Sequence, residues 1–461
     1  MAVFDSRSGP AAAYQARVVR DGVTAFGQRQ FSVFVQDTYE RGRVTLDAGV
    51  RFDRQDDEAL SATIPASPIL PDLLPAVRFA GADSGVVYND VSPRLGVGWD
   101  IGGNGRTVFR AAFERHVGQG NHSSAPLQPT GQTRLVYWWD DADGDGLVDR
   151  DELDYARGLA ATPSSNYDAA RPAAVRTPAT VDPGLRNTVV DEWSLRLERE
   201  LARHLTLRVA YVGRNTHRVQ RTFPVRADGS LVSSDTFAPV VWAPASCATG
   251  AECPPVTYFE RNEALPAGTV LRNDGEYGWR HAVDVVVHKR MARGWMIDAS
   301  ARWETSSWQF PTATFDYTDP TNIAVRSGAE DPALGSRWIV EVAGTGRLPW
   351  GLVLSGVAAA RDGAPYERGV TTPNRGSLGT TVADLKRFGS ERYPAVVRVD
   401  ARLERRFATG RLELVPAVEL SNLLNANTVL ARNRVQNTPS ANQVTRILAP
   451  RAVRIEVDIV W

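Results

Sequence analysis

The sequence is poor in the residues that usually build reactive centres. Its 461 residues include two cysteines and six histidines, which leaves little material for a metal cluster or a nucleophile–base pair. We find no Ser/His/Asp or Cys/His arrangement, so we expect no enzyme activity. Lysine plus arginine and aspartate plus glutamate both number 53, so no excess positive charge indicates nucleic-acid binding.

Long apolar runs are also absent. No stretch approaches the roughly 18–20 apolar residues that a membrane-spanning helix needs. Residues 1–22 lack the basic segment and apolar core of a secretory signal. Taken alone, this favours a cytosolic protein. The alternative, which we prefer, is that the sequence is the C-terminal part of a longer exported chain.

What the sequence does contain is a repeated alternation of apolar and polar residues. Residues 452–461 (AVRIEVDIVW) place apolar side chains on one face of a strand and charged ones on the other. The same alternation recurs in segments that are joined in pairs by very short turns, as expected for β-hairpins. The pairs are 31–35 with 44–52, 95–101 with 109–113, 193–197 with 205–211, 283–287 with 295–303, 340–342 with 352–358, and 397–403 with 412–420.

The connections between these hairpins are long, polar and rich in proline and glycine. They span 54–91, 117–187, 215–278, 309–335, 363–393 and 423–446. A soluble β-sandwich also alternates, but six structureless loops of this length are improbable in a soluble domain. Short turns at one rim and long loops at the other are typical of outer-membrane barrels, with periplasmic turns and extracellular loops.

We therefore predict an all-β fold, a transmembrane antiparallel β-barrel that begins at about residue 30. The pattern gives about 13 strands, and Tyr14–Arg20 is a candidate for one more. The final strand should end on the periplasmic side, and its residues Val457, Ile459 and Trp461 should act as the signal for the barrel-assembly machinery. Six tryptophans at strand ends or turns predict aromatic girdles at the membrane interfaces. They are Trp99, Trp193, Trp295, Trp303, Trp350 and Trp461.

Several segments, taken in order, resemble barrel strands of TonB-dependent outer-membrane receptors, and most closely the Oar-like group. They are 31–37 (FSVFVQD), 44–53 (VTLDAGVRFD), 92–96 (SPRLG), 107–113 (TVFRAAF), 191–195 (DEWSL), 421–425 (SNLLN) and 448–451 (LAPR). The resemblance extends from about Phe31 to the end of the chain. It implies a C-terminal portion of a barrel of about 22 strands, ligand binding at extracellular loops, and uptake powered through TonB.

The family's plug domain has no room in this sequence, and no TonB box is visible. We therefore expect the TonB complex as a partner only if a plug domain lies upstream. We assign residues 1–29 to a partial strand or loop and residues 30–461 to the barrel domain. The lipid bilayer and an extracellular ligand are the other expected partners. Two alternatives remain open: a structural or adhesion barrel with calcium-stiffened surface loops, and a secreted soluble calcium-binding β-sandwich.

The sharpest local motif lies in the longest connection, 117–187. Residues 141–152 (DADGDGLVDRDE) match the calcium-loop pattern D-x-D-x-D-G with glutamate at the twelfth position. Such closely spaced carboxylates repel one another unless a divalent cation offsets the repulsion. The alternative is a solvated acidic loop. We predict one structural Ca²⁺, bound by Asp141, Asp143, Asp145, the Leu147 carbonyl, Asp149 and Glu152.

The two cysteines, Cys247 and Cys253, are separated by five residues in another long connection. An even count and close spacing in an exported protein favour a disulfide, because that compartment is oxidising. Free thiols or a metal pair are the alternatives. No histidine lies nearby and the spacing is not that of a zinc site, so we predict the disulfide.

Overall fold

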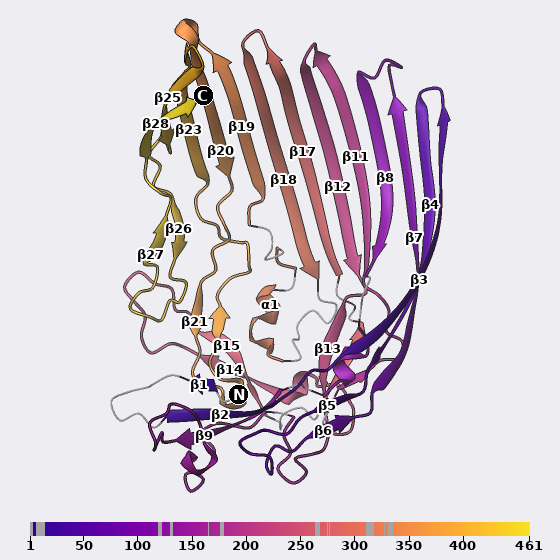
Figure 1. Cartoon of the computed structure of the whole chain (residues 1–461), viewed down its shortest axis with the longest axis vertical. Helices are drawn as coiled ribbons and strands as arrows, with labels where there is room; N and C mark the ends of the chain where they lie inside the picture. Colours follow the sequence, from indigo (N-terminus) through magenta and orange to yellow (C-terminus); the bar gives the residue numbers. More distant parts are fainter. Residues whose placement is uncertain are drawn as a thin grey trace.

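One large antiparallel sheet dominates the computed structural model of the chain (Figure 1). The structure describes residues 3–5, 14–118, 122–129, 132–164, 166–175, 179–262, 268–273, 275, 277–309, 318–326, 328–330 and 335–461. The sheet has 14 strands in the order β24-β25-β23-β20-β19-β18-β17-β12-β11-β8-β7-β4-β3, with β28 paired to β25. An all-β antiparallel fold was predicted, and the structure confirms it.

Thirteen of these strands are long. Their bounds are β3 (Phe26–Arg41), β4 (Val44–Ala59), β7 (Ala82–Asp100), β8 (Thr107–Val117), β11 (Val189–Ala202), β12 (Leu205–His217), β17 (Tyr277–Ala292), β18 (Trp295–Gln309), β19 (Trp338–Arg347), β20 (Leu352–Arg361), β23 (Val396–Arg405), β25 (Leu412–Ser421) and β28 (Ala452–Val460). The fourteenth, β24 (Phe407–Thr409), has three residues and pairs with β25. Each long strand contains one of the alternating segments identified in the sequence.

Short turns join the long strands at one end of the sheet, which we call the short-turn rim. The β3–β4 ladder continues to the pair Arg41–Val44, so two residues make the turn, and Gly42 there has φ +60°. In the β17–β18 turn Arg293 and Gly294 both have positive φ, as the turns that match strand twist require. In the β7–β8 turn the Asp100 carboxylate accepts the N–H groups of Gly103 and Gly105.

Among the described residues, the opposite end of the sheet, the loop end, contains six small sheets (Figure 1). They are formed by β1 (Val3–Asp5), β2 (Tyr14–Asp21) and β9 (Gln132–Trp139); β10 (Ala179–Val181), β16 (Gly268–Asn273) and β13 (Gln220–Val225); β14 (Phe237–Trp242) and β15 (Val256–Arg261); β21 (Gly369–Thr371) and β22 (Val382–Asp384); β26 (Val429–Arg432) and β27 (Val444–Ile447); and β5 (Ala62–Ile64) and β6 (Val77–Phe79). The expectation of structureless connections is therefore wrong.

The helices of the described residues are short. They are η1 (Ala125–Leu127), η2 (Arg150–Glu152), η3 (Ser234–Thr236), η4 (Pro320–Asn322), α1 (Ile323–Arg326), η5 (Pro349–Gly351) and η6 (Gly376–Leu378). None of the helices in the described residues has the length and apolar character needed to span a bilayer.

Strand β2 corrects one further expectation. Tyr14–Arg20 does form a strand, but it pairs with β9 in a small sheet and not with the large one. Its alternate residues Ala16, Val18 and Arg20 are buried. Ala16 and Val18 pack into a hydrophobic cluster at the loop end, and Arg20 donates to the carbonyls of Pro75 and Pro172. Alternation alone does not distinguish a strand that buries its apolar face in protein from one that presents it to lipid.

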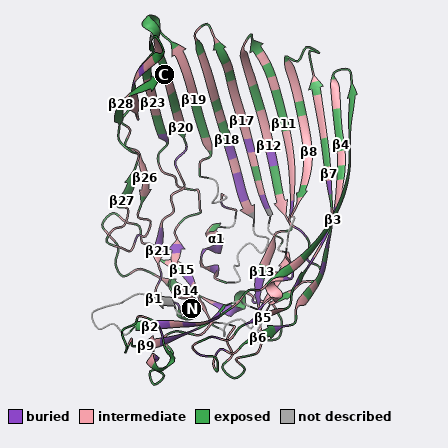
Figure 2. Cartoon of the chain, in the orientation of Figure 1, coloured by how far each residue is buried: buried purple, intermediate pink, exposed green. Residues whose placement is uncertain are grey.

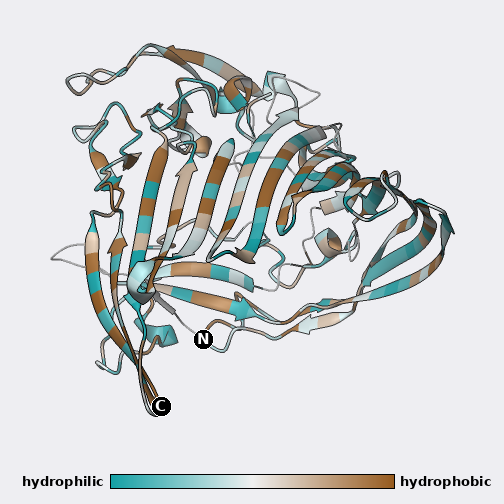
Figure 3. Cartoon of the chain, turned by 90° about the horizontal axis from the view of Figure 1, so that it is seen from above, coloured by the Kyte–Doolittle hydropathy of each residue, from teal (hydrophilic) through white to brown (hydrophobic). Residues whose placement is uncertain are grey.

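The large sheet is curved and open (Figure 3). Its edge strands, β3 and β28, form no ladder with each other. Every neighbouring pair of long strands is antiparallel. Both edge strands consequently run towards the short-turn rim, where the C-terminus lies (Figure 1).

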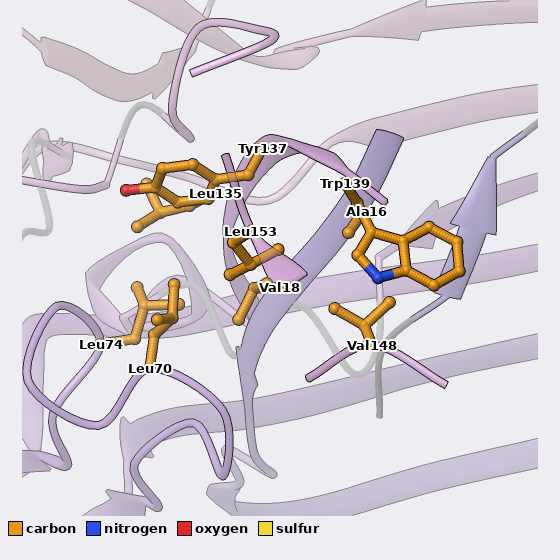
Figure 4. Packing of buried hydrophobic residues seen from close by; sticks show 9 residues of the cluster. All are labelled: Ala16, Val18, Leu70, Leu74, Leu135, Tyr137, Trp139, Val148 and Leu153. Carbon is orange, nitrogen blue, oxygen red and sulfur yellow. The ribbon is translucent and has the colours of Figure 1, made fainter. Parts of the chain in front are cut away.

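The main hydrophobic cluster of the described residues lies at the loop end rather than against the large sheet (Figures 2 and 4). It joins β2, β9 and two loop segments. Its members are Ala16, Val18, Leu70, Leu74, Leu135, Tyr137, Trp139, Val148 and Leu153. The connections 54–91 and 117–187, together with β2, therefore fold around a core of their own, which gives this part of the loop end a defined surface.

Candidate functional site: two faces of the sheet and an acidic loop

The large sheet presents exposed apolar side chains on one face. Ile455 on β28 is 77% exposed and Leu95 on β7 is 54% exposed. The same face continues across the sheet through residues of most long strands. They include Val33, Val50, Leu195, Val209, Trp303, Val340, Leu354, Val397, Leu403 and Val418. Soluble monomers rarely expose contiguous apolar surface on this scale, so the face requires a lipid environment.

The opposite face is charged, and its charges are paired. Arg402 contacts Glu404 at 3.0 Å and also Glu456 on β28. The pairs commonly join residues two apart in one strand, which share a face. They are Arg51–Asp53, Arg302–Glu304, Arg398–Asp400, Arg402–Glu404 and Arg454–Glu456. The repeated R-x-[DE] spacing places these pairs on the face opposite to the apolar side chains, and a charged wall of this kind suits a polar lumen.

Three of the predicted calcium ligands lie together in the structure. One carboxylate oxygen from each of Asp141, Asp143 and Asp145 lies within 4.8 Å of the others. Gly146 has φ +75°, and a Cβ there would meet no atom within 4 Å. This is the sharp turn that the sixth position of a calcium loop needs. The donors are all hard oxygens, so the residues present fit Ca²⁺.

Glu152 lies apart from the three aspartates in the structure. Its carboxylate accepts hydrogen bonds from the Trp139 indole N–H at 2.9 Å and from the backbone N–H groups of Ala142 at 2.8 Å and Asp149 at 3.2 Å. The Trp139 bond contributes most to holding the pKa of Glu152 below its ordinary 4.5. Glu152 therefore braces the two ends of the loop and lies outside the aspartate group.

The remaining predicted ligands lie on the C-terminal half of the loop. The Leu147 side chain is exposed, and its N–H donates to Asp145 at 2.7 Å. Desolvation, followed by the charge of Asp145, raises the pKa of Asp149. Val148 and Leu153 are buried in the loop cluster, next to Trp139 (Figure 4). The acidic loop is thus attached to a rigid core on both sides.

Cys247 and Cys253 lie at disulfide distance, with their Cα atoms 6.0 Å apart. Between them, Glu252 forms an ion pair with Arg368 at 2.8 Å. Arg368 also contacts Glu391, and this hydrogen bond holds the pKa of Glu391 below its ordinary 4.5. The cysteine loop is therefore attached to the 363–393 connection through charged groups.

A group of aromatic side chains near the loop end extends the predicted girdle. The Tyr211 hydroxyl and His281 Nδ1 are 2.8 Å apart, and the Trp193 indole N–H donates to Tyr211 at 3.4 Å. A hollow of about 500 Å³ adjoins them, lined by Trp193, Asn215, Thr216, His217, Trp279 and His281. Trp193 was expected here. The other residues of this group were not predicted from the sequence, although they follow the apolar part of each strand, and that position was a usable signal.

The C-terminal residues lie at the edge of the sheet. Val457 and Ile459 are exposed on β28, and Trp461 follows the strand with 91% of its surface exposed. In the β25–β28 ladder, Val457 lies opposite Pro416 and Ile459 lies opposite Leu414. Their role as an assembly signal remains a prediction.

An antiparallel sheet with an apolar outer face, a charged inner face and short turns at one rim defines an integral protein of the bacterial outer membrane. The sequence matches the family model described as "Outer membrane beta barrel domain" over residues 8–353. The chain belongs to this family. The secreted soluble sandwich is therefore excluded.

Solved structures of outer-membrane transporters are similar to the chain at low identity. The outer membrane transporter YddB from Escherichia coli has 12% identity and a TM-score of 0.47, with 97% of this chain and 55% of that chain covered. The ferric yersiniabactin uptake receptor FyuA from Yersinia pestis has 12% identity and a TM-score of 0.45, with 98% and 48% covered. The chain thus spans about half the length of these structures. No protein with curated information matches the sequence.

Proposed function

We propose that the chain is the barrel portion of a TonB-dependent outer-membrane receptor of the Oar-like group, which takes up a ligand across the outer membrane. The order of the resembling segments supports this assignment. The observation that carries it is the combination of a paired, charged inner wall with two long connections, 54–91 and 117–187, that fold around their own core. A polar lumen offers a path, and a structured loop surface offers a place to bind a ligand outside the cell.

Uptake can be tested without knowing the ligand. Cells with the intact or deleted gene would be grown in the same complex medium, and compounds remaining in the medium would be measured by mass spectrometry. We expect a compound that is depleted by the intact strain alone, with depletion abolished by a protonophore. Depletion that survives the protonophore would indicate a passive pore. If the two strains deplete the medium equally, the assignment fails, and the adhesion barrel becomes the better candidate.

We also propose that residues 141–152 bind one Ca²⁺ as a structural clamp. Asp141, Asp143 and Asp145 would supply the first carboxylates, and the Leu147 carbonyl, Asp149 and Glu152 would complete the set. The gathered aspartates and the turn at Gly146 support this proposal. The bound ion would offset the repulsion within the loop and fix the loop against the hydrophobic cluster that contains Val148. Extracellular calcium modules bind at roughly 10⁻⁴–10⁻³ M, which suits a clamp.

A further inference from the structure

The short-turn rim carries charge of one sign. It consists of six segments, each a turn with any strand-end residues that adjoin it: 41–43, 101–106, 201–204, 290–294, 347–351 and 405–411. These 30 residues include ten arginines and no aspartate or glutamate, in a chain whose net formal charge is zero. Every segment has at least one arginine, and all ten are exposed. They are Arg41, Arg43, Arg106, Arg203, Arg290, Arg293, Arg347, Arg405, Arg406 and Arg411. We call this set the arginine collar.

The acidic groups beside the turns neutralise little of the collar. Arg106 is 3.4 Å from Glu200, and Arg406 is 2.8 Å from Glu413. The nearby Asp100 carboxylate accepts hydrogen bonds from two backbone N–H groups of its own turn. Eight collar arginines form no ion pair with any described residue. Two of the eight have other contacts: Arg43 donates to the Ile101 carbonyl at 3.3 Å, and Arg405 lies over an aromatic ring. The other six form no side-chain contact of these kinds with the described residues. They are Arg41, Arg203, Arg290, Arg293, Arg347 and Arg411.

Exposed aromatic side chains occur at the same rim. Trp350 is 80% exposed within its turn, and Trp99 and Trp295 are also exposed at strand ends. Arg405 lies over the ring of Phe407, with 4.7 Å between the guanidinium carbon and the ring centroid. Tryptophan and tyrosine favour the headgroup level of a membrane, with the apolar ring on the lipid side. The aromatic residues therefore mark the level at which the collar meets the bilayer.

We propose that the arginine collar binds the phosphate groups of anionic phospholipids in the leaflet at the short-turn rim. Guanidinium groups pair with phosphate through two parallel hydrogen bonds, so unpaired arginines match this chemistry. The charges are spread over all six turns, along the whole arc of the sheet (Figure 1). A ring of lipids contacts such an arc throughout, whereas one acidic protein would cover a part of it. The proposal depends on membrane placement and is independent of ligand uptake.

The test compares lipid retention by the full chain and two matched variants. The first replaces unpaired collar residues, Arg203→Gln, Arg290→Gln, Arg293→Gln and Arg347→Gln. The control removes the same charge from exposed arginines of the loop end, Arg78→Gln, Arg387→Gln, Arg446→Gln and Arg451→Gln. Each protein is folded in detergent micelles that contain equal amounts of phosphatidylglycerol and phosphatidylcholine. The two lipids have acyl chains of the same length. Native mass spectrometry then counts the lipids of each kind that stay bound.

We expect wild type and control to prefer phosphatidylglycerol, and the collar variant to lose that preference by on the order of tenfold or more. For the wild type alone, the preference should fall several-fold between about 0.05 and 0.5 M NaCl, because salt screens exposed charges. This second measurement stands even if the collar variant does not fold. No preference in wild type, or equal loss in both variants, would overturn the proposal. If the collar variant retains the preference for phosphatidylglycerol, the proposal is also overturned. An acidic protein segment would then be the better candidate for the partner that binds the collar.

Discussion

At the scale of single residues, Glu152 shows what a motif specifies and what it leaves open. The spacing of residues 141–152 assigned it to the ion, and three aspartates of the same motif do gather. In the structure its oxygens accept hydrogen bonds from Trp139 and two backbone N–H groups. Trp139 and Ala142 lie thirteen and ten residues before Glu152, and they approach it only because the loop folds back on itself. The spacing of the motif could not predict these hydrogen bonds.

The two carboxylates Asp143 and Glu152 should therefore respond differently to loss of charge. Asp143→Asn should weaken calcium binding by on the order of tenfold and leave the calcium-free loop intact, because Asp143 is exposed and contacts only the loop. Glu152→Gln should weaken binding and also raise protease sensitivity of residues 137–155 in chelator. Calorimetric Ca²⁺ titration and limited proteolysis measure the two effects. Equal affinity in wild type and both variants would leave a solvated acidic loop.

The cysteine pair leads to a second prediction at this scale. A thiol reagent should fail to label Cys247 and Cys253 in unreduced protein and should label both after reduction. Since Glu252 joins the cysteine loop to Arg368, reduction should also increase hydrogen exchange in residues 363–393. Mass spectrometry of labelled peptides gives both results. Ready labelling without reductant would refute the disulfide.

Glu391 gives a pH dependence to the same contact. Its folded pKa is lowered, chiefly by the Arg368 hydrogen bond, so its contribution to stability is present above the ordinary value of 4.5 and is lost as pH falls through the folded pKa. Hydrogen exchange in 363–393 should therefore be slower in wild type than in Glu391→Gln at pH 7. The difference in hydrogen exchange between the two proteins should shrink as pH falls through the folded pKa of Glu391, which lies below 4.5. A difference that does not depend on pH would contradict this assignment.

At the scale of elements, the strands of the large sheet could be predicted and the loops could not. Each of the 13 long strands repeats the same two-residue period, and turns such as 42–43 are short enough to fix the pairing. The small sheets lack both signals. Strands such as β10, β16 and β13 pair across long stretches of sequence, so their partners are set by packing. One face of each long strand faces lipid and the other faces the polar interior. The apolar and polar residues therefore alternate along the whole strand, and this alternation can be read from the sequence.

The contact between Gly213 on β12 and the Trp193 ring on β11 can be tested by substitution. A Cβ at Gly213 would lie 2.4 Å from the Trp193 ring, whereas a Cβ at Gly346 on β19 would meet no atom within 4 Å. Gly213→Ala should therefore displace Trp193 and destabilise the sheet by about 1–3 kcal/mol, the usual cost of overpacking. Gly346→Ala is the matched control and should have little effect. Thermal unfolding followed by gel mobility measures both, and equal midpoints would refute the contact.

At the scale of the whole molecule, the asymmetry between the two ends predicts an orientation. The loop end should face the outside of the cell and the short-turn rim the periplasm. Proteinase K added to intact cells should cleave the protein within residues 117–187 and should not cleave the 102–105 turn. In permeabilised cells the protease should cleave both segments. Cleavage of the short turns in intact cells, with the long loops protected, would reverse the orientation.

The directions of the two edge strands limit how the sheet can be closed. Because β3 and β28 both run towards the short-turn rim, direct pairing between them would be parallel in an otherwise antiparallel sheet. A second copy in the same membrane orientation presents the same two directions, so it offers neither edge an antiparallel neighbour. Antiparallel closure takes an odd number of additional strands, whose first and last members run towards the loop end. A barrel of about 22 strands meets this parity rule, since 22 less these 13 leaves nine.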